Sequence, residues 1–235
     1  MLEFKNLSKS YNGSTKAVND LSLVIEDGDI YAFVGPNGAG KTTTLKCACG
    51  ILDFNEGDIL IDGESIKKNP LVCKKKIAYI PDNPDLYEFL KGIDYLNFVC
   101  DIYDVSENRE ELIRKYSDMF ELTGFLGNTI STYSHGMKQK LAIIASLIHE
   151  PKILLLDEPF VGLDPVSAHT LKKIMKDLTK KGACIFFSTH VLEVAEKLCN
   201  KVAVIKKGKL VVSGNMKDVI KNKSLEDLFL ENMHE

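Results

Sequence analysis

One stretch of nine residues, GPNGAGKTT at positions 35–43, constrains the fold of this chain more than any other. The residues before it, DIYAFV, are mostly apolar and β-branched or aromatic, and those after it, TLKCACGIL, carry apolar residues at helical spacing. The expected order is therefore strand, glycine-rich loop and helix. Glycines let successive N–H groups point into one concavity, and the helix start adds its positive dipole end. The stretch predicts an anion-binding site.

The spacing within this stretch specifies the anion. It follows the pattern G-x-x-x-x-G-K-[ST], in which the loop backbone cradles nucleotide phosphates. We expect a nucleoside-triphosphate site in which Lys41 reaches the β- and γ-phosphates and the Thr42 hydroxyl binds Mg²⁺. The residues expected around the nucleotide are Gly35, Pro36, Asn37, Gly38, Ala39, Gly40, Lys41, Thr42 and Thr43.

Strand-like segments recur along the chain and predict its fold class. Residues 1–34 alternate apolar and polar residues, with turn signals at Asn12-Gly13 and Asp27-Gly28, which indicates antiparallel strands. Several later segments are apolar throughout, which is typical of parallel strands covered by helices on both faces. We predict an α/β fold with a mostly parallel, helix-covered core sheet and an N-terminal antiparallel β subdomain. The later expected strands are residues 58–61, 76–80, 152–157, 184–188 and 201–205.

The domain organisation follows from where the strands stop. With 235 residues the chain has the length of one domain, and between about 83 and 149 only helical periodicity is present. We expect one domain, in which an α-helical subdomain at about 83–149 is inserted into a nucleotide-binding core. The core is expected at about 1–82 and 150–214, with a hairpin near its end, and helices are expected at 215–235.

Composition excludes several classes of protein. The net charge is −3 and the charges are interspersed, so we expect no nucleic-acid partner. No run of 18 apolar residues is present, and the N-terminus has no signal-peptide pattern, so we expect a cytoplasmic chain without a membrane span. The six cysteines lack the paired spacing of zinc or redox sites, and buried free thiols are expected.

Two further stretches place polar side chains at expected strand ends, where open α/β sheets bind ligands. ILLLDEP ends in Asp157, expected to hold Mg²⁺, and Glu158, expected to act as general base on an attacking water; the alternative is a pair of solvated acids. FSTH ends in His190, which either reaches a γ-phosphate or is merely structural.

Ser134 is expected to be the N-cap of a helix within residues 132–148.

Taken in order, these stretches resemble the ATP-binding cassette (ABC) family of ATPases from about Phe4 to Gly214. GPNGAGKTT resembles its Walker A motif, ILLLDEP its Walker B motif, YSHGMKQK its signature, GLDP its D-loop and STH its switch histidine. The resemblance implies ATP and Mg²⁺ as ligands and adenine stacking on Tyr11. An ordinary strand tyrosine is the alternative for that residue.

The resemblance also implies a mechanism that needs two chains. Two subunits, either identical or related cassettes, would sandwich two ATP molecules, with Ser134 and the Gly136 N–H acting on the ATP held by the other chain. A helix N-terminus aimed at a γ-phosphate closes the dimer while ATP is intact, and hydrolysis removes that bridge. Asp164, in the D-loop, would help the two sites communicate.

Two positions depart from the family's usual pattern. The signature normally reads LSGGQ, and here His135 replaces a glycine and Met137 the glutamine. The backbone N–H groups survive these changes, and we hypothesise that the His135 imidazole makes closure sensitive to pH. Asp82 stands where the family commonly has a glutamine that links Mg²⁺ and the attacking water to the helical insert. We therefore expect Asp82 to be a catalytic residue and a ligand of Mg²⁺, with a turn-capping role as the alternative.

The leading interpretation is the ATPase subunit of a transporter, bound at the cytoplasmic face of the membrane to a separate membrane-spanning permease. The segments after Asp82 and around Ser134 are similar to the ABC-2 group, whose members are mostly exporters. One alternative is a soluble ABC ATPase that acts on a cytoplasmic assembly. Another is a module that closes on ATP without hydrolysing it, and the presence of Glu158 argues against it.

Overall fold

The computed structural model describes residues 1–11, 13 and 15–234, so Asn12, in the first expected turn, lies outside the described residues. The chain forms two compact units. The first consists of Met1–Tyr79, Lys152–Pro159 and Met175–Glu235, and the second of Ile80–Pro151 and Phe160–Ile174. The second unit therefore combines the region of the expected helical insert with a later segment that holds the GLDP stretch.

The first unit contains a four-stranded antiparallel sheet with the strand order β2-β1-β4-β5. β1 and β2 alternate buried and exposed positions along part of their length, which is why the sequence alternates there. The expected antiparallel N-terminal strands are thus present. Within residues 1–34 they are β1 (Leu2–Ser10) and β2 (Lys16–Ile25). β4 (Glu56–Ile61) and β5 (Glu64–Ser65) complete this sheet, so the strand expected at 58–61 belongs to it and not to the core sheet.

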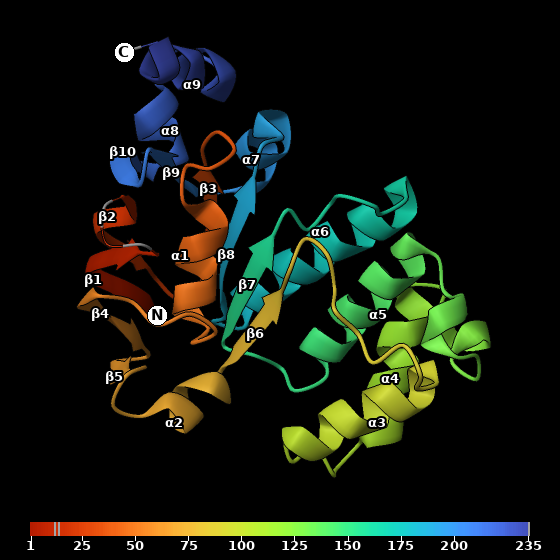
Figure 1. The fold of residues 1–235 in the computed structure, drawn as a ribbon. Helices are drawn as coiled ribbons and strands as arrows, with labels where there is room; N and C mark the ends of the chain where they lie inside the picture. The colour runs from red at the N-terminus through yellow and green to blue at the C-terminus, as the bar shows by residue number, and fades with distance from the viewer. Residues whose placement is uncertain (12, 14, 235) are drawn as a thin grey trace. The chain divides into compact units, whose positions relative to one another are not determined.

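The central sheet has six strands in the order β10-β9-β3-β8-β7-β6 (Figure 1). β9, β3, β8 and β7 pair in parallel, and every residue of β3, β7 and β8 is buried. β10 returns antiparallel beside β9, which confirms the expected hairpin. The predicted parallel core sheet is confirmed, with strands β3 (Ile30–Val34), β6 (Ile77–Ile80), β7 (Ile153–Asp157), β8 (Cys184–Thr189), β9 (Lys201–Lys206) and β10 (Lys209–Asn215).

Helices complete both units. The first unit holds α1 (Lys41–Ala48), α2 (Pro70–Lys74), α7 (Leu192–Leu198), α8 (Met216–Ile220) and α9 (Leu225–His234). The second holds α3 (Gly92–Ile102), α4 (Arg109–Met119), α5 (His135–Leu147) and the short 3-10 turns η1 (Thr123–Phe125) and η2 (Ile130–Thr132). α6 (Pro165–Lys180) begins in the second unit and ends in the first. Within the described part of the chain, no helix combines the length and the apolar character needed to cross a bilayer.

The core of the first unit joins its two sheets through aromatic packing. The ring of Phe186, on β8, lies 5.7 Å from that of Phe4 on β1, and 6.1 and 5.0 Å from those of Tyr31 and Phe33 on β3, measured between ring centroids. Phe186 is fully buried, and so are most of its neighbours. All six cysteines are also buried and free, as expected from their spacing. The strand that leads toward His190 is therefore fixed by contacts to both sheets.

This packing predicts the effect of removing the central ring. Phe186→Ala is expected to lower the free energy of unfolding by about 3–5 kcal/mol, because it removes apolar contacts and leaves a cavity between the sheets. Chemical denaturation followed by circular dichroism measures the change. Phe89→Ala is the matched control: Phe89 is 79% exposed, so its loss is expected to cost less than about 0.5 kcal/mol. Equal effects of the two substitutions would contradict the assigned core.

Candidate functional site

The phosphate loop joins β3 to α1 and is packed so closely that two of its glycines have no room for a side chain. A Cβ added to Gly35 would lie 2.5 Å from the carbonyl oxygen of Ile205 on β9. One added to Gly40, whose φ is +108°, would lie 2.3 Å from the carbonyl oxygen of Ala17 on β2. Neighbouring strands thus press on the loop from outside, and its conformation requires glycine at both positions.

Lys41 is the first residue of α1 and supplies the positive charge of the loop. Its Nζ donates hydrogen bonds to the carbonyl oxygens of Gly35 at 2.6 Å and Pro36 at 3.2 Å. Burial lowers the pKa of Lys41, and the charges of Glu158 and Asp157 partly oppose this effect. The first N–H groups of a helix have no acceptor within the helix. An ammonium group and free N–H donors at one loop are suited to bind a polyphosphate.

Tyr11 lies just beyond β1, beside the phosphate loop. Its hydroxyl is 3.1 Å from the Thr43 hydroxyl, and the residue is 59% exposed. The Lys9 ammonium lies 5.3 Å from the ring centroid, over one face. An exposed aromatic ring next to a phosphate loop offers a surface on which a nucleotide base can stack.

The two carboxylates at the end of β7 have different environments. Asp157 pairs with Ser188 in the parallel β7–β8 ladder, is 3% exposed, and accepts a hydrogen bond from the Ser188 hydroxyl. The next residue, Glu158, has a left-handed backbone with φ of 48°, and its N–H donates to the Ser188 carbonyl at 3.2 Å. Such a conformation is uncommon for a residue other than glycine. It lets two adjacent carboxylates take separate positions.

Glu158 and His190 are in direct contact. The His190 Nδ1 lies 2.9 Å from Oε2 of Glu158, and the His190 backbone N–H donates to the same oxygen at 3.3 Å. Only 14% of the Glu158 side chain is exposed, against 60% of the His190 side chain. The structure thus places a carboxylate with a fixed orientation beside an exposed imidazole.

Thr42 and Asp157 fit the Mg²⁺ expected with the nucleotide. Both offer hard oxygen ligands, and Mg²⁺ in nucleotide sites takes one or two protein oxygens together with phosphate oxygens and water. The Asp157 carboxylate is buried with a hydroxyl donor that holds it in place. In the described residues there is no cluster of three or more His, Cys, Asp or Glu side chains. Such a cluster is not needed for Mg²⁺ bound in this way.

The remaining predicted residues lie in the second unit. Ser134 is the N-cap of α5, since its Oγ accepts a hydrogen bond from the Met137 N–H at 3.2 Å, as the sequence predicts. His135 is exposed and Gly136 is half-buried at the same helix start. Asp82 is exposed in the loop between β6 and α3.

Asp164 caps the start of α6 and belongs to a small polar cluster. Its carboxylate accepts hydrogen bonds from the Ser167 N–H at 2.9 Å and the Ser167 hydroxyl at 2.7 Å. The Lys140 ammonium, from α5, lies 2.8 Å from the same carboxylate. The Lys140 contact, followed by the Ser167 donors, holds the pKa of Asp164 well below its usual range. Asp164 is therefore ionised at neutral pH.

The structure groups the predicted residues into two sets. The set in the first unit consists of Tyr11, the loop residues 35–43, Asp157, Glu158 and His190. The set in the second unit consists of Asp82, Ser134, His135, Gly136 and Asp164. Sequence reasoning missed Ser188 and Lys140. Neither residue has a sequence signal of its own, because each acts through a contact, with Asp157 or Asp164, that tertiary structure creates.

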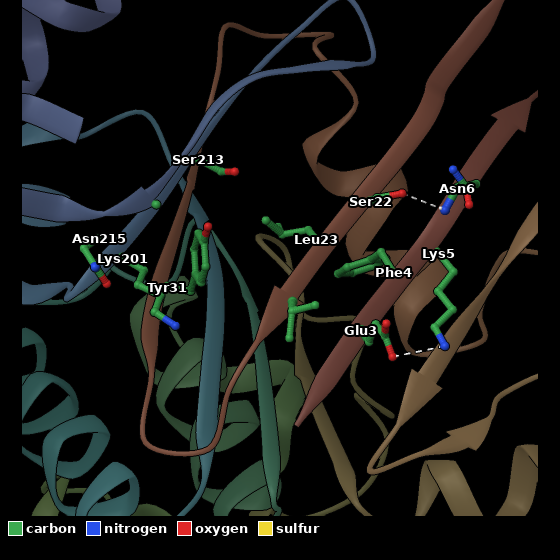
Figure 2. Close-up of a pocket in the computed structure, with 12 residues that line it drawn as sticks. Glu3, Phe4, Lys5, Asn6, Ser22, Leu23, Tyr31, Lys201, Ser213 and Asn215 are labelled. Carbon is green, nitrogen blue, oxygen red and sulfur yellow. Dashed lines mark hydrogen bonds and ion pairs between the residues drawn. The ribbon is translucent and has the colours of Figure 1, made fainter. Parts of the chain in front are cut away.

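A separate groove of about 610 Å³ lies elsewhere in the first unit (Figure 2). Its lining includes Tyr31, near the start of β3, and so lies at the end of that strand away from the phosphate loop. Its charged side chains are paired, Glu3 with Lys5 at 3.4 Å and Lys201 with Asp29 at 2.9 Å. No predicted site residue lines it, so the phosphate loop remains the candidate site.

Known proteins share both the sequence and this fold. The ABC transporter family profile matches residues 18–161. The ABC transporter ATP-binding protein YhcH of Bacillus subtilis (strain 168) is 39% identical over 219 residues, which make up 93% of this chain and 71% of YhcH. A solved ATP-binding subunit of an ABC transporter is 33% identical and covers 99% of both chains, with a TM-score of 0.95.

A dimeric ATP-binding cassette, MJ0796 bound to ADP and phosphate, has a TM-score of 0.83 over 92% of this chain and 99% of its own. At 23% identity this similarity concerns the fold alone. The profile match and the identity to YhcH identify the family, and the solved subunit confirms the predicted P-loop cassette fold. The chain belongs to the ABC transporter family and is one of its ATP-binding, ATP-hydrolysing cassettes.

Proposed function

We propose that this chain powers export through a separate membrane-spanning permease, by closing on ATP together with a second cassette. The observation that carries the proposal is the start of α5. Ser134 caps this helix at an exposed position, and the N–H groups of His135 and Gly136 have no acceptor within the helix. These donors suit a γ-phosphate that another chain holds in its phosphate loop.

The first unit supplies the groups for hydrolysis. Lys41 and the loop N–H groups hold the β- and γ-phosphates, and Glu158 accepts a proton from the attacking water as the bond from the γ-phosphorus to the bridging oxygen breaks. Thr42 and Asp157 would hold Mg²⁺, which would offset phosphate charge. His190 keeps the Glu158 carboxylate oriented through its ring and its N–H and reaches the γ-phosphate. The products are ADP and phosphate.

Hydrolysis reverses closure because the bridging group is the γ-phosphate itself. While ATP is intact, the phosphate joins Lys41 of one chain to the α5 start of the other. Once the phosphate is free, the second chain loses its charged partner. The dimeric cassette that shares this fold supports a two-chain assembly. For this chain we propose a homodimer or a pairing with a related cassette.

An exposed aromatic cluster in the second unit supports docking on a permease. Tyr87 lies 6.0 Å from Phe89, 6.3 Å from Tyr95 and 5.7 Å from Phe98, measured between ring centroids. Tyr87, Phe89 and Phe98 are all exposed. Contiguous exposed aromatic side chains mark protein interaction surfaces, and aromatic residues are enriched there. The cluster begins five residues after Asp82 and lies in the same unit.

The direction of transport rests on resemblance. Residues 83–105 and the stretch around Ser134 resemble ABC-2 ATPase subunits, which are mostly exporters, and we therefore propose export. The competing function is a soluble ABC ATPase that acts on a cytoplasmic assembly. The exposed aromatic cluster favours a protein partner, and the identity of that partner separates the two functions.

The closure proposal predicts nucleotide-dependent dimerisation of Glu158→Gln. This variant is expected to bind ATP without hydrolysing it and to sediment as a dimer with ATP and Mg²⁺, but as a monomer with ADP. Adding Lys41→Met is expected to abolish the dimer because the phosphates lose their cation. Adding Ser134→Glu is expected to do the same because a carboxylate repels the γ-phosphate. A Glu158→Gln chain that stays monomeric with ATP in analytical ultracentrifugation would show that the proposal is wrong.

The position of Tyr11 predicts a loss of affinity when its ring is removed. Tyr11→Ala is expected to weaken ADP binding about tenfold, since base stacking on an aromatic side chain is worth about 1–3 kcal/mol. Tyr11→Phe keeps the ring and loses the hydroxyl beside Thr43, so its affinity is expected to stay within about twofold of the original. Isothermal titration calorimetry measures both affinities. Unchanged ADP affinity in Tyr11→Ala would show that Tyr11 does not stack on the base and would favour the alternative of an ordinary strand tyrosine.

The aromatic cluster predicts which partner is recovered from cells. Tagged Glu158→Gln, purified from its native membranes with ATP and Mg²⁺, is expected to bring down a multi-helix membrane protein identifiable by mass spectrometry. The pair Tyr87→Ala and Phe89→Ala is expected to abolish this recovery. Phe125→Ala is the matched control, since Phe125 is an exposed aromatic of the same unit outside the cluster. Recovery of ribosomes, nucleic acid or nothing would favour the soluble alternative.

A further inference from the structure

We propose that His135 and Lys140 act as positioning residues that tie loop 160–164 to the start of α5, so that these two parts of one chain move as one body. The proposal rests on the proposed function for its consequence, since both parts are expected to meet the second cassette. It does not depend on that function for its structural basis. All of the residues involved lie in the second unit.

The first tie is the contact of His135 with Gly162. A Cβ placed on Gly162 would come within 2.7 Å of Cδ2 and 2.9 Å of Nε2 of His135, so the imidazole covers the glycine. A Cβ on Gly136 would lie 2.9 Å from the Gly162 carbonyl oxygen, so the two backbones also approach closely. Gly162 has φ of +80°, which further restricts the position to glycine. The side chain at 135 thus occupies space that a glycine there would leave open.

The second tie is the ion pair of Lys140 with Asp164. The two groups are 2.8 Å apart, and only 14% of the Lys140 side chain is exposed. Asp164 is held at the same time by the N–H and hydroxyl of Ser167 at the start of α6. Lys140 lies about one and a half helical turns after His135 on α5. The loop is therefore held at two points by one helix.

The loop is also held at its beginning. The Lys172 ammonium, on α6, lies 5.2 Å from the centroid of the Phe160 ring, and the Leu163 N–H donates to the Phe160 carbonyl oxygen at 3.4 Å. A short segment fixed at Phe160 and Asp164 has little freedom of its own. The part of the loop that still needs to be held is its middle, at Gly162, and the His135 ring lies against this residue.

These contacts give a physical role to His135, which replaces the glycine that is usual in the family's signature. When the α5 start engages a γ-phosphate, a loop that is tied to it must follow, which couples two surfaces through rigid contacts rather than through a flexible link. A glycine at 135 would remove one of the ties. We therefore expect His135 to strengthen the coupling between the two ATP sites of a closed pair.

Hydrogen exchange of the chain without nucleotide tests the ties directly. In His135→Gly and in Lys140→Met, exchange of the Leu163 amide is expected to speed up about tenfold, since local opening no longer has to break the tie. Lys140→Arg keeps a cation for Asp164 and is expected to restore slow exchange. Lys138→Met is the matched control, because Lys138 lies on the same helix and pairs with Glu88. Unchanged exchange in both His135→Gly and Lys140→Met would overturn the proposal.

ATPase assays of the same variants test the consequence. The Hill coefficient for ATP, which can reach the number of coupled sites, is expected to fall toward one in His135→Gly and Lys140→Met and to stay at the original value in Lys140→Arg and Lys138→Met. A general loss of structure would lower the ATPase rate of a variant, but it would not reproduce this difference in Hill coefficient between the variants. Faster exchange with an unchanged Hill coefficient would overturn the coupling role. Failure of the Glu158→Gln chain to dimerise would instead contradict the proposed function and leave the exchange result standing.

Discussion

The parallel pairing of β3, β8 and β7 is the constraint on which the site depends. Val34 at the end of β3 lies beside Thr189, and Asp157 at the end of β7 lies beside Ser188. Because the three strands end together, the segments that follow them meet at one sheet edge. A shift of one residue in either ladder would turn Asp157 or Ser188 to the opposite face of the sheet. The register of the two ladders thus determines whether Asp157 and Ser188 face the site.

Register alone does not shape the phosphate loop. Gly35 and Gly40 are required because β9 and β2, which come from distant parts of the sequence, present carbonyl oxygens against them. The aromatic core around Phe186 joins β1, β3 and β8, and β2 and β9 pair directly with β1 and β3. The glycine pattern of a phosphate loop therefore reflects two demands at once, free N–H groups toward the ligand and close backbone packing behind it.

The sequence predicts most of what depends on local pattern. The buried strands, the hairpin after β9, the Ser134 cap and the phosphate loop follow from periodicity and from residue types with few conformational options. Ser188 and Lys140 could not be predicted, because their importance arises from contacts with residues about thirty and twenty-four positions away that only tertiary structure creates. The grouping of residues 160–174 with the helical unit likewise depends on packing and leaves no pattern in the sequence.

The two units hold different parts of the site that we propose for ATP hydrolysis. The first unit holds the phosphate loop and the Glu158–His190 pair, and we propose that nucleotide binding and proton transfer take place there. The capped helix start that suits a γ-phosphate resides in the second unit. If one chain filled both roles for its own ATP, hydrolysis would proceed without a partner. When the helix start of a second chain is required, free energy from ATP binding is used first to bring two chains together. In the proposed function, this closure is the step to which a bound permease responds.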